Sequence, residues 1–238
     1  MKLLIVLITH NRLSYTQKTL RNLLKTIEVP YFLVVADNAS TDGTIDWLKG
    51  HEKRNKIDKI IFNPDNYYPG KATNIGWKEG LKDYPEATHL MRLDNDMHLE
   101  KGWDTTAEDY FKKIPELGQL GIDHEAIEHP NAKLREVEIN GKVLNPWPGC
   151  VGGPNIIRRK IWDLGLRYEE LMWNDGRNTP LQEDSKFSKS IQNHGYLTGH
   201  MTENLVRTFA NETNWSDYPE YYKKTMTDRG YLDNLEKI

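Results

Sequence analysis

The stretch Thr88-His-Leu-Met-Arg-Leu-Asp-Asn-Asp96 predicts a buried strand that ends in two carboxylates, Asp94 and Asp96. Residues i and i+2 of an extended segment point to the same side, so the two carboxylates can share one target. In an open α/β sheet, ligands bind at the carboxyl ends of the strands, where this pair lies. A hard divalent cation, which prefers oxygen ligands, suits such a pair. An Asp-x-Asp pair is also common in polar turns, so the rest of the chain has to decide between the two interpretations.

Three earlier apolar runs also predict buried strands that end in polar residues. They indicate strands over residues 3–8, 31–36 and 59–62, separated by helices over 14–25, from 40–42 onward, and over 71–81. Ser14 is the expected N-cap of the first helix. Strands that alternate with helices imply right-handed βαβ units and a mainly parallel sheet. The polar loops after the four strands would then gather on one edge: Thr9–Arg12, Asp37–Ser40, Asn63–Asn66 and Asp94–Asp96.

The second half of the chain predicts a mixture of elements. Expected are helices over residues 105–114, 156–164 and 182–193, strands over 119–122 and 196–201, and a hairpin over 135–144. The hairpin carries Asn140-Gly141, a pair typical of a type I′ turn. No periodicity is visible from Val206 onward. Because the chain has no internal repeat and no low-complexity linker, we expect one compact unit.

Composition narrows the class of partner. The chain has 238 residues with 32 basic and 35 acidic side chains, a net charge of −3. This balance provides no global electrostatic case for nucleic acid or an anionic membrane, although a local basic patch would change that. The single cysteine, Cys150, excludes an internal disulfide and favours a reducing, cytoplasmic location.

The N-terminus does not have the pattern of a targeting segment. The apolar run Leu3–Ile8 is shorter than the apolar region of a signal peptide, and no small-residue cleavage site follows it. We expect a buried first strand there instead. No later run approaches the length of a transmembrane helix, so no membrane segment is expected.

Several common catalytic motifs are absent from the sequence. No Gly-x-Gly-x-x-Gly follows the first strand and no Gly-x-x-x-x-Gly-Lys-Ser/Thr occurs, which argues against a dinucleotide oxidoreductase or a P-loop enzyme. No serine or cysteine lies in a nucleophile elbow. No cluster of cysteine and histidine exists for zinc.

Six motifs occupy the ends of the predicted strands and the start of one helix. They are Thr9-His-Asn-Arg12, Asp37-Asn-Ala-Ser-Thr-Asp-Gly43, Asn66-Tyr-Tyr-Pro-Gly-Lys-Ala-Thr-Asn-Ile-Gly76, Leu93-Asp-Asn-Asp96, Gly152-Gly-Pro-Asn-Ile-Ile-Arg-Arg159 and Gln182-Glu-Asp184. In order and spacing this set resembles the family 2 glycosyltransferases of the GT-A fold, over residues 3 to 200. Tyr68 stands where glycine is usual, and Lys186 where many members carry a second aspartate. These departures bear on sugar and acceptor preference more than on the reaction.

The resemblance implies an α/β protein with a mainly parallel central sheet flanked by helices and a small antiparallel element on the acceptor side. It implies one domain over residues 1–238, with a nucleotide-sugar-binding half (1–96), an acceptor and catalytic half (97–205) and a C-terminal tail (206–238). The implied reaction moves a sugar, with inversion, from a nucleotide-diphosphate donor to an acceptor hydroxyl. A UDP-sugar is the expected donor, and Mn²⁺ or Mg²⁺ the expected cofactor.

The resemblance also distributes roles among the polar residues. Asp96 would hold the metal with Asp94 as a looser partner, and His200 is a further candidate ligand. A metal there acts as a Lewis acid toward the leaving diphosphate. Asp184 is the candidate general base, which takes the proton from the acceptor hydroxyl. Asp37 would accept a hydrogen bond from the nucleobase. The full set assigned to the nucleotide-sugar is Thr9, Asn11, Arg12, Asp37, Lys71, Asp94 and Asn95, with Asn95 as the spacer of the Asp-x-Asp motif.

Structural roles are the alternatives at four of these positions. Asp37 can simply form a turn, and Lys71 can be a solvated residue at the start of a helix. His200 can be a structural histidine. The Glu183-Asp184 pair can do no more than place negative charge at a helix N-terminus, where it is favourable in any case.

Two other functions stay open. A sugar nucleotidyltransferase shares the α/β architecture and the carboxylate–metal chemistry, but it would carry a glycine-rich phosphate loop after the first strand. A non-catalytic nucleotide- or carbohydrate-binding module would not need both the Asp-x-Asp and the Glu-Asp motif. The acceptor is open as well. A glycan or another hydroxyl-bearing molecule is expected, and a nucleic acid acceptor remains an alternative.

Overall fold

A computed structural model describes residues 1–52, 57–123, 135–146, 149–170, 183–209 and 216–228. Its strands are β1 (Leu3–Thr9), β2 (Tyr31–Asn38), β3 (Lys59–Asn63), β4 (His89–Asp94), β5 (Met97–Leu99), β6 (Leu117–Gly121), β7 (Val137–Ile139), β8 (Lys142–Asn145), β9 (Asn155–Arg158), β10 (Leu197–Met201) and β11 (Val206–Thr208). Its helices are α1 (Leu13–Thr26), α2 (Thr44–Glu52), α3 (Tyr68–Asp83), α4 (Trp103–Lys113), α5 (Arg159–Asp163), α6 (Glu183–Asn193) and α7 (Pro219–Asp228).

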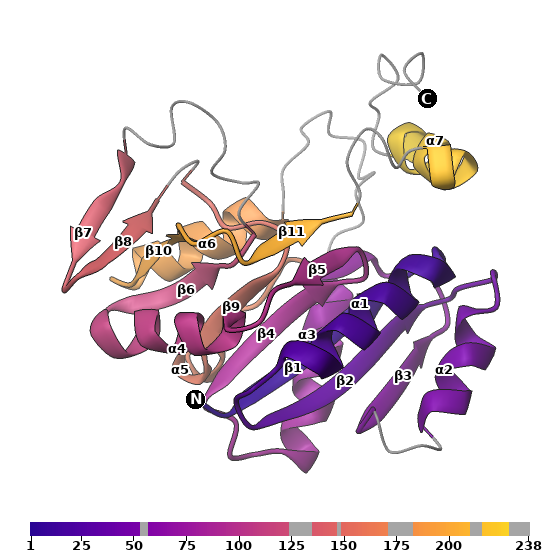
Figure 1. Cartoon of the computed structure of the whole chain (residues 1–238), viewed down its shortest axis with the longest axis horizontal. Coiled ribbons are helices and arrows are strands. Elements are labelled where there is room, and N and C mark those ends of the chain that lie inside the picture. The colour runs from indigo at the N-terminus through magenta and orange to yellow at the C-terminus, as the bar shows by residue number, and fades with distance from the viewer. Residues whose placement is uncertain (53–56, 124–134, 147–148, 171–182, 210–215, 229–238) are drawn as a thin grey trace.

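The strands form one large sheet and one small sheet (Figure 1). The nine strands of the large sheet follow the order β3-β2-β1-β4-β9-β6-β10-β8-β7. Neighbours from β3 to β4 run parallel, whereas β9 runs antiparallel to both of its neighbours. The small sheet is the antiparallel pair β11-β5. The predicted α/β architecture is therefore confirmed: a parallel first half continues into a mixed second half.

The register of the parallel strands brings their carboxyl ends together. Thr9 at the end of β1 lies opposite Asp37 on β2, and Ile8 lies opposite Asp94 on β4. The polar loops that follow these strands therefore share one edge of the sheet, as the sequence predicts. This edge is where the candidate site forms.

The large sheet has an apolar core on each face. Every residue of β1 is buried, and its side chains enter two clusters in alternation, as a strand covered on both faces requires. One cluster also contains side chains of α1, α2 and α4, and the other contains side chains of α3, α5 and α6. The strands thus lie between two layers of helices. From β1, the first cluster takes Leu3, Ile5 and Leu7, and the second takes Leu4, Val6 and Ile8.

The two predicted halves of the chain share the large sheet. Strands β1 to β4 come from residues before Asn95, and the sheet continues through the pairing of β4 with β9. None of the helices within the described ranges is long and apolar enough to cross a membrane.

One predicted helix is wrong. The sequence predicts a helix over residues 156–164, but the structure has strand β9 followed by the short helix α5. Ile156 and Ile157 are completely buried in the middle of the sheet, between β4 and β6. Their β-branched side chains suit a strand. The local pattern could not show this, because both partner strands come from elsewhere in the chain.

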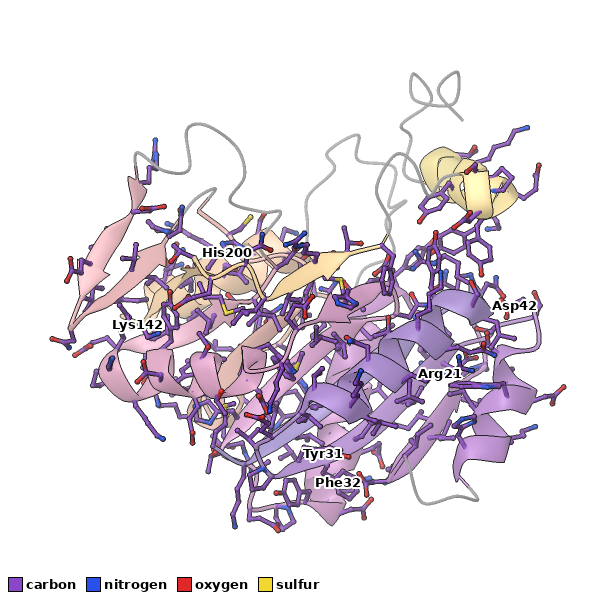
Figure 2. All side chains as sticks on the ribbon, in the orientation of Figure 1. Arg21, Tyr31, Phe32, Asp42, Lys142 and His200 are labelled. Carbon is purple, nitrogen blue, oxygen red and sulfur yellow. The ribbon has the colours of Figure 1, made fainter. Side chains whose placement is uncertain are left out.

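The N-cap predicted for the first helix is also wrong. The N-cap of α1 is Arg12, in the left-handed conformation with φ of 57°. The backbone N–H of Leu13 donates to Oδ2 of Asp42 at 2.8 Å, so a loop distant in sequence satisfies the helix end. Asp42 is labelled in Figure 2. The hydroxyl of Ser14 instead lies 2.5 Å from that of Tyr218.

The sequence predicts the hairpin correctly but misses the elements of the C-terminal tail. Asn140 and Gly141 have φ of 50° and 75°, as a type I′ turn requires, so the hairpin of β7 and β8 is confirmed. The tail contains β11 and α7, which the sequence did not predict. Strand β5, the partner of β11, was not predicted either, because three residues are too short to show a period.

Gly76 allows α3 to lie directly on the sheet. A Cβ at this position would come within 2.6 Å of the side chain of Val6 on β1, whereas a Cβ at Gly50 on α2 would meet nothing within 4 Å. We therefore expect Gly76→Ala to lower the free energy of unfolding by about 1–3 kcal/mol through overpacking. Gly50→Ala, the matched control, should raise it by up to about 1 kcal/mol because alanine favours the helix. Denaturant unfolding measures both, and equal effects would show that α3 does not depend on a glycine at position 76 to pack on the sheet.

Candidate active site

A cavity of about 680 Å³ lies at the carboxyl ends of β1, β2 and β4. Five of the sequence-predicted residues line it: Asn11, Arg12, Asp94, Asn95 and Asp96. Its other walls come from the start of α3, the segments after β6 and before β9, and α7. Other residues that line the cavity include His10, Asn38, Tyr68, Arg92, Asp123, Gly153, Tyr221, Tyr222 and Lys224. The structure thus brings the first motif and the Asp-x-Asp motif together.

The two carboxylates of the Asp-x-Asp motif bind different partners. Oδ1 of Asp94 accepts from Nε of Arg92 at 3.2 Å, and Oδ2 of Asp96 accepts from NH1 of Arg12 at 2.8 Å. The strand ends at Asp94 and a turn follows, so the simple alternation of an extended chain does not continue to Asp96. Both carboxylates nevertheless line the same cavity and stay partly exposed, at 25% and 14%.

Arg12 binds the side chains of both Asp96 and its neighbour Asn95. NH2 of Arg12 donates to Oδ1 of Asn95 at 2.6 Å, and Nδ2 of Asn95 donates to the hydroxyl of Thr16 on α1 at 2.9 Å. Burial opposes the charge of Arg12, but Asp96, with smaller contributions from Tyr221 and Tyr222, outweighs burial, so the pKa of Arg12 lies above its ordinary value. Asn95 is 2% exposed and joins the Asp-x-Asp turn to α1. Its side chain is more than a spacer.

Arg92 joins Asp94 of the Asp-x-Asp motif to Asp184, the candidate base. The sequence motifs did not predict a role for this arginine. It is 4% exposed on β4. NH1 donates to Oδ1 of Asp184 at 2.7 Å and lies 3.6 Å from Oε1 of Glu183, while Nε donates to Asp94. Burial opposes its charge, but Asp184 and Asp94 outweigh it and hold the pKa of Arg92 well above the ordinary value. One signal was available: a charged residue inside an apolar strand, two positions before Asp94 and on the same side.

Asp184 lies in the first turn of α6 at the edge of the cavity. It is not one of the lining residues, and its side chain is 24% exposed. A Cβ at Gly152 would lie 3.4 Å from its Oδ2, so the glycine leaves space beside the carboxylate. The pKa of Asp184 is raised to about 7: burial is the largest cause, Glu183 and Asp94 add to it, and Arg92 opposes them. A carboxylate with this pKa is suited to accept a proton near neutral pH.

Thr9 and Asp37 are brought together, but away from the cavity surface. Asp37 is completely buried. Its Oδ1 accepts from the hydroxyls of Thr9 and Ser40 at 2.7 and 2.6 Å, and its Oδ2 accepts from the backbone N–H of Ser40 at 2.9 Å. These contacts fix the loop after β2. Contact of Asp37 with a nucleobase stays a prediction, and it would require some of these hydrogen bonds to change.

The other predicted residues hold structure around the site. Oδ1 of Asn11 accepts from the backbone N–H of Thr41 at 2.8 Å, which ties the first loop to the second. Nζ of Lys71 lies 3.8 Å from the ring centre of Tyr67 and does not line the cavity. His200, labelled in Figure 2, is 1% exposed on β10 against Gly121. It does not line the cavity, so its role as a metal ligand stays a prediction.

The oxygen ligands in this cavity suit a divalent cation whose coordination shell also includes atoms of a substrate. Within the described ranges, no group of three or more His, Cys, Asp or Glu side chains could hold a metal by itself. Asp94 and Asp96 both line the cavity and supply carboxylate oxygens to it. Mg²⁺ is usually bound in this way, by one or two carboxylates together with substrate phosphates and water. The residues present therefore fit a metal that binds with a phosphorylated ligand.

Asp123 is a further acidic residue that the sequence did not single out. It follows β6 and lines the cavity. A Cβ at Gly153 would lie 3.9 Å from Oδ2 of Asp123 and 4.0 Å from Oδ2 of Asp94, so both carboxylates face the same small region. Its position after a strand that ends at the site was the available signal, but no motif marked it.

Fold and site together define an α/β protein of the GT-A class with a carboxylate-lined cavity at the strand ends. The model of a family described as glycosyl transferase family 2 matches residues 4–165, which is more than half of the chain. The chain belongs to this family. The predicted resemblance is therefore confirmed. No curated protein matches the chain significantly.

Solved structures of low sequence identity share the fold. One is a mannosyltransferase from Pyrobaculum calidifontis in complex with GDP-Man and Mn²⁺, with a TM-score of 0.69, 14% identity and 96% of this chain covered. Another is TarS from S. aureus in complex with UDP-GlcNAc, with a TM-score of 0.65, 20% identity and 95% covered. A third is GalNAc-T7 with UDP, GalNAc and Mn²⁺, with a TM-score of 0.64, 16% identity and 87% covered. The chain spans 62%, 64% and 44% of these three chains.

Arg92 pairs with three carboxylates, so its removal should be costly. We expect Arg92→Gln to lower the free energy of unfolding by about 3 kcal/mol, the lower end for a broken buried ion pair, because two of the carboxylates are partly exposed. The control is Arg159→Gln, which breaks the partly exposed pair with Asp163 and a hydrogen bond to the carbonyl of Pro85, and should cost less than about 1 kcal/mol. Denaturant unfolding compares the two variants. A loss at position 92 no larger than that at 159 would show that the carboxylates do not depend on Arg92.

Proposed function

We propose that this protein is a metal-dependent, inverting glycosyltransferase that moves a sugar from a nucleotide-diphosphate donor to an acceptor hydroxyl. The observation that carries the proposal is the bridge made by Arg92. It joins Asp94, the first carboxylate of the Asp-x-Asp motif, to Asp184, at the start of a helix from the other half of the chain. A donor held beside Asp94 would therefore have a carboxylate of suitable pKa next to it. The division into a donor half (1–96), an acceptor half (97–205) and a tail (206–238) is part of the proposal.

The donor end of the site consists of Asp94, Asp96 and Arg12. Asp96, with Asp94 beside it, would hold a divalent cation, Mn²⁺ or Mg²⁺; when bound, such an ion neutralises the charge that develops on a leaving diphosphate. Arg12 supplies a permanent positive charge at the same wall of the cavity. A UDP-sugar is the donor to test first, because two of the similar structures contain UDP or UDP-GlcNAc; the GDP-Man of the third makes a GDP-sugar the next.

Asp184 is the proposed general base. Its carboxylate takes the proton of an acceptor hydroxyl as that oxygen attacks the anomeric carbon from the face opposite the diphosphate. Direct displacement of this kind inverts the anomeric centre. Arg92 orients the carboxylate through the 2.7 Å contact between its NH1 and Oδ1, which leaves Oδ2 to face Gly152. The acceptor is proposed to be a glycan or another hydroxyl-bearing molecule.

Removal of the base tests the chemistry. Asp184→Asn keeps the shape of the side chain but cannot take a proton, so transfer should fall by about 10²–10⁴-fold. Binding of UDP, measured by calorimetry with Mn²⁺, should change little. Glu183→Gln is the control at the neighbouring position and should retain most of the transfer activity. Transfer by Asp184→Asn at the rate of the unmodified protein would exclude Asp184 as the base.

The pH dependence of transfer follows from the raised pKa of Asp184. Transfer needs the deprotonated carboxylate, so kcat/KM should fall as the pH drops below about 7 and level off above it. An ordinary exposed aspartate would not lose activity until much lower pH. The measurement is a kcat/KM profile with saturating metal at each pH. A profile that stays level well below neutral pH would contradict the raised pKa or the role of Asp184.

A further inference from the structure

Arg12 is bound from two sides by parts of the chain that lie far apart in the sequence. On one side it donates to Asp96 and Asn95, at 2.8 and 2.6 Å. On the other side it meets α7: the ring centre of Tyr221 lies 4.5 Å from the guanidinium carbon, and the hydroxyl of Tyr222 accepts from NH1 at 3.3 Å. A single cation therefore holds both the proposed metal ligand and the C-terminal helix.

The guanidinium of Arg12 is enclosed, but it is not fully satisfied. Its side chain is 9% exposed, and its buried Nε has no hydrogen-bond partner among the described residues. A buried donor without a partner costs free energy. Asp96 keeps 14% of its side chain exposed and lines the cavity, so a solute can reach the carboxylate that Arg12 binds.

We propose that Arg12 and the divalent cation compete for Asp96, so that metal binding releases Arg12 and, with it, α7. The proposal rests on the proposed function, which assigns Asp96 to the metal. NH1 of Arg12 lies 2.8 Å from Oδ2 of Asp96, so it takes one acceptor position of this oxygen and places a positive charge beside any metal bound there. Two cations at one carboxylate oxygen also repel each other. Arg12 therefore acts as a positioning residue that neutralises Asp96 until the metal replaces it.

Release of Arg12 would loosen α7 because its tyrosines lose their cation. Tyr221 loses a cation–π contact and Tyr222 loses a hydrogen bond. Four residues of α7 line the cavity, so this helix is one wall of the proposed donor site, above the start of α1 in Figure 1: Glu220, Tyr221, Tyr222 and Lys224. Linkage between two binding equilibria is reciprocal. If metal binding weakens the docking of α7 on Arg12 by some factor, the docking of α7 must weaken metal binding by the same factor.

The first measurement uses Mn²⁺ alone with the full chain, by calorimetry. Arg12→Gln removes the competitor and should bind Mn²⁺ about 5-fold more tightly or better, a typical size for coupling between two sites. The control is Lys18→Gln, which removes the same charge from α1, where Lys18 lies over the rings of Tyr15 and Phe209, and its affinity should match the unmodified protein. Asp96→Ala should lose Mn²⁺ binding. A merely structural role for Arg12 would not produce tighter binding.

The second measurement follows hydrogen–deuterium exchange of the backbone amides of α7. Mn²⁺ should speed exchange in the unmodified protein. In Arg12→Gln, exchange should already be fast without Mn²⁺ and should not respond to it. Tyr221→Leu, which leaves Arg12 and Asp96 in place, keeps the test open if Arg12→Gln does not fold. This variant should show faster exchange in α7 together with tighter Mn²⁺ binding.

The outcomes separate this inference from the proposed function. If Mn²⁺ binding depends on Asp96 but Arg12→Gln or Tyr221→Leu leaves the affinity unchanged, the inference is overturned and the proposed metal site stands. If Mn²⁺ leaves exchange in α7 unchanged, the coupling to the helix is overturned. If the unmodified protein binds no Mn²⁺, with or without UDP, both the inference and the metal dependence of the proposed function fail. In that case Arg12 itself remains as the cation at Asp96.

Discussion

The site depends on one buried cation, Arg92, which holds three carboxylates from two parts of the chain. Asp94 comes from the same strand, and Glu183 and Asp184 begin a helix that lies about 90 residues further along. Without the guanidinium, these carboxylates would repel each other in a poorly hydrated space. Arg92 therefore makes their approach possible. It also leaves Asp184 with a raised pKa, since burial outweighs the stabilisation that Arg92 provides.

A second arginine completes the arrangement on the other side of the Asp-x-Asp turn. Asp94 binds Arg92 and Asp96 binds Arg12, so the turn lies between two cations. The two ends differ in what surrounds them. The Arg92 end faces α6 and the proposed base, while the Arg12 end faces α1 and the tyrosines of α7. Proton transfer is therefore proposed at the Arg92 end of the turn, whereas the proposed metal, held by Asp96 with Asp94 beside it, meets Arg12 at the other end.

Much of this could be predicted from the sequence because it depends on local patterns. The four parallel strands and their polar loops follow from apolar runs that end in turn residues, and the strand order brings those loops together. The motifs of Thr9–Arg12 and Asp94–Asp96 marked residues that do line one cavity.

What the sequence could not predict depends on partners from distant segments. The run at Ile156 and Ile157 has no period that separates a helix from a central strand. Arg12 meets Asp96 across 84 residues and Tyr222 across 210. Asp37 has the residue type and position for nucleobase contact, yet its oxygens are taken up by Thr9 and Ser40, which only the folded structure shows.

Asp94, Asp96 and Asp184 are proposed to form a glycosyl-transfer site for a nucleotide-diphosphate sugar. The most direct test incubates the full chain with a panel of nucleotide-sugars and Mn²⁺ and measures release of nucleoside diphosphate, since donor hydrolysis needs no acceptor. At least one donor should release nucleoside diphosphate and free sugar, and a chelator should abolish the release. Release of no nucleoside diphosphate from any donor, or formation of pyrophosphate with a nucleotide-sugar from a sugar phosphate and a nucleoside triphosphate, would contradict the proposed glycosyl-transfer site.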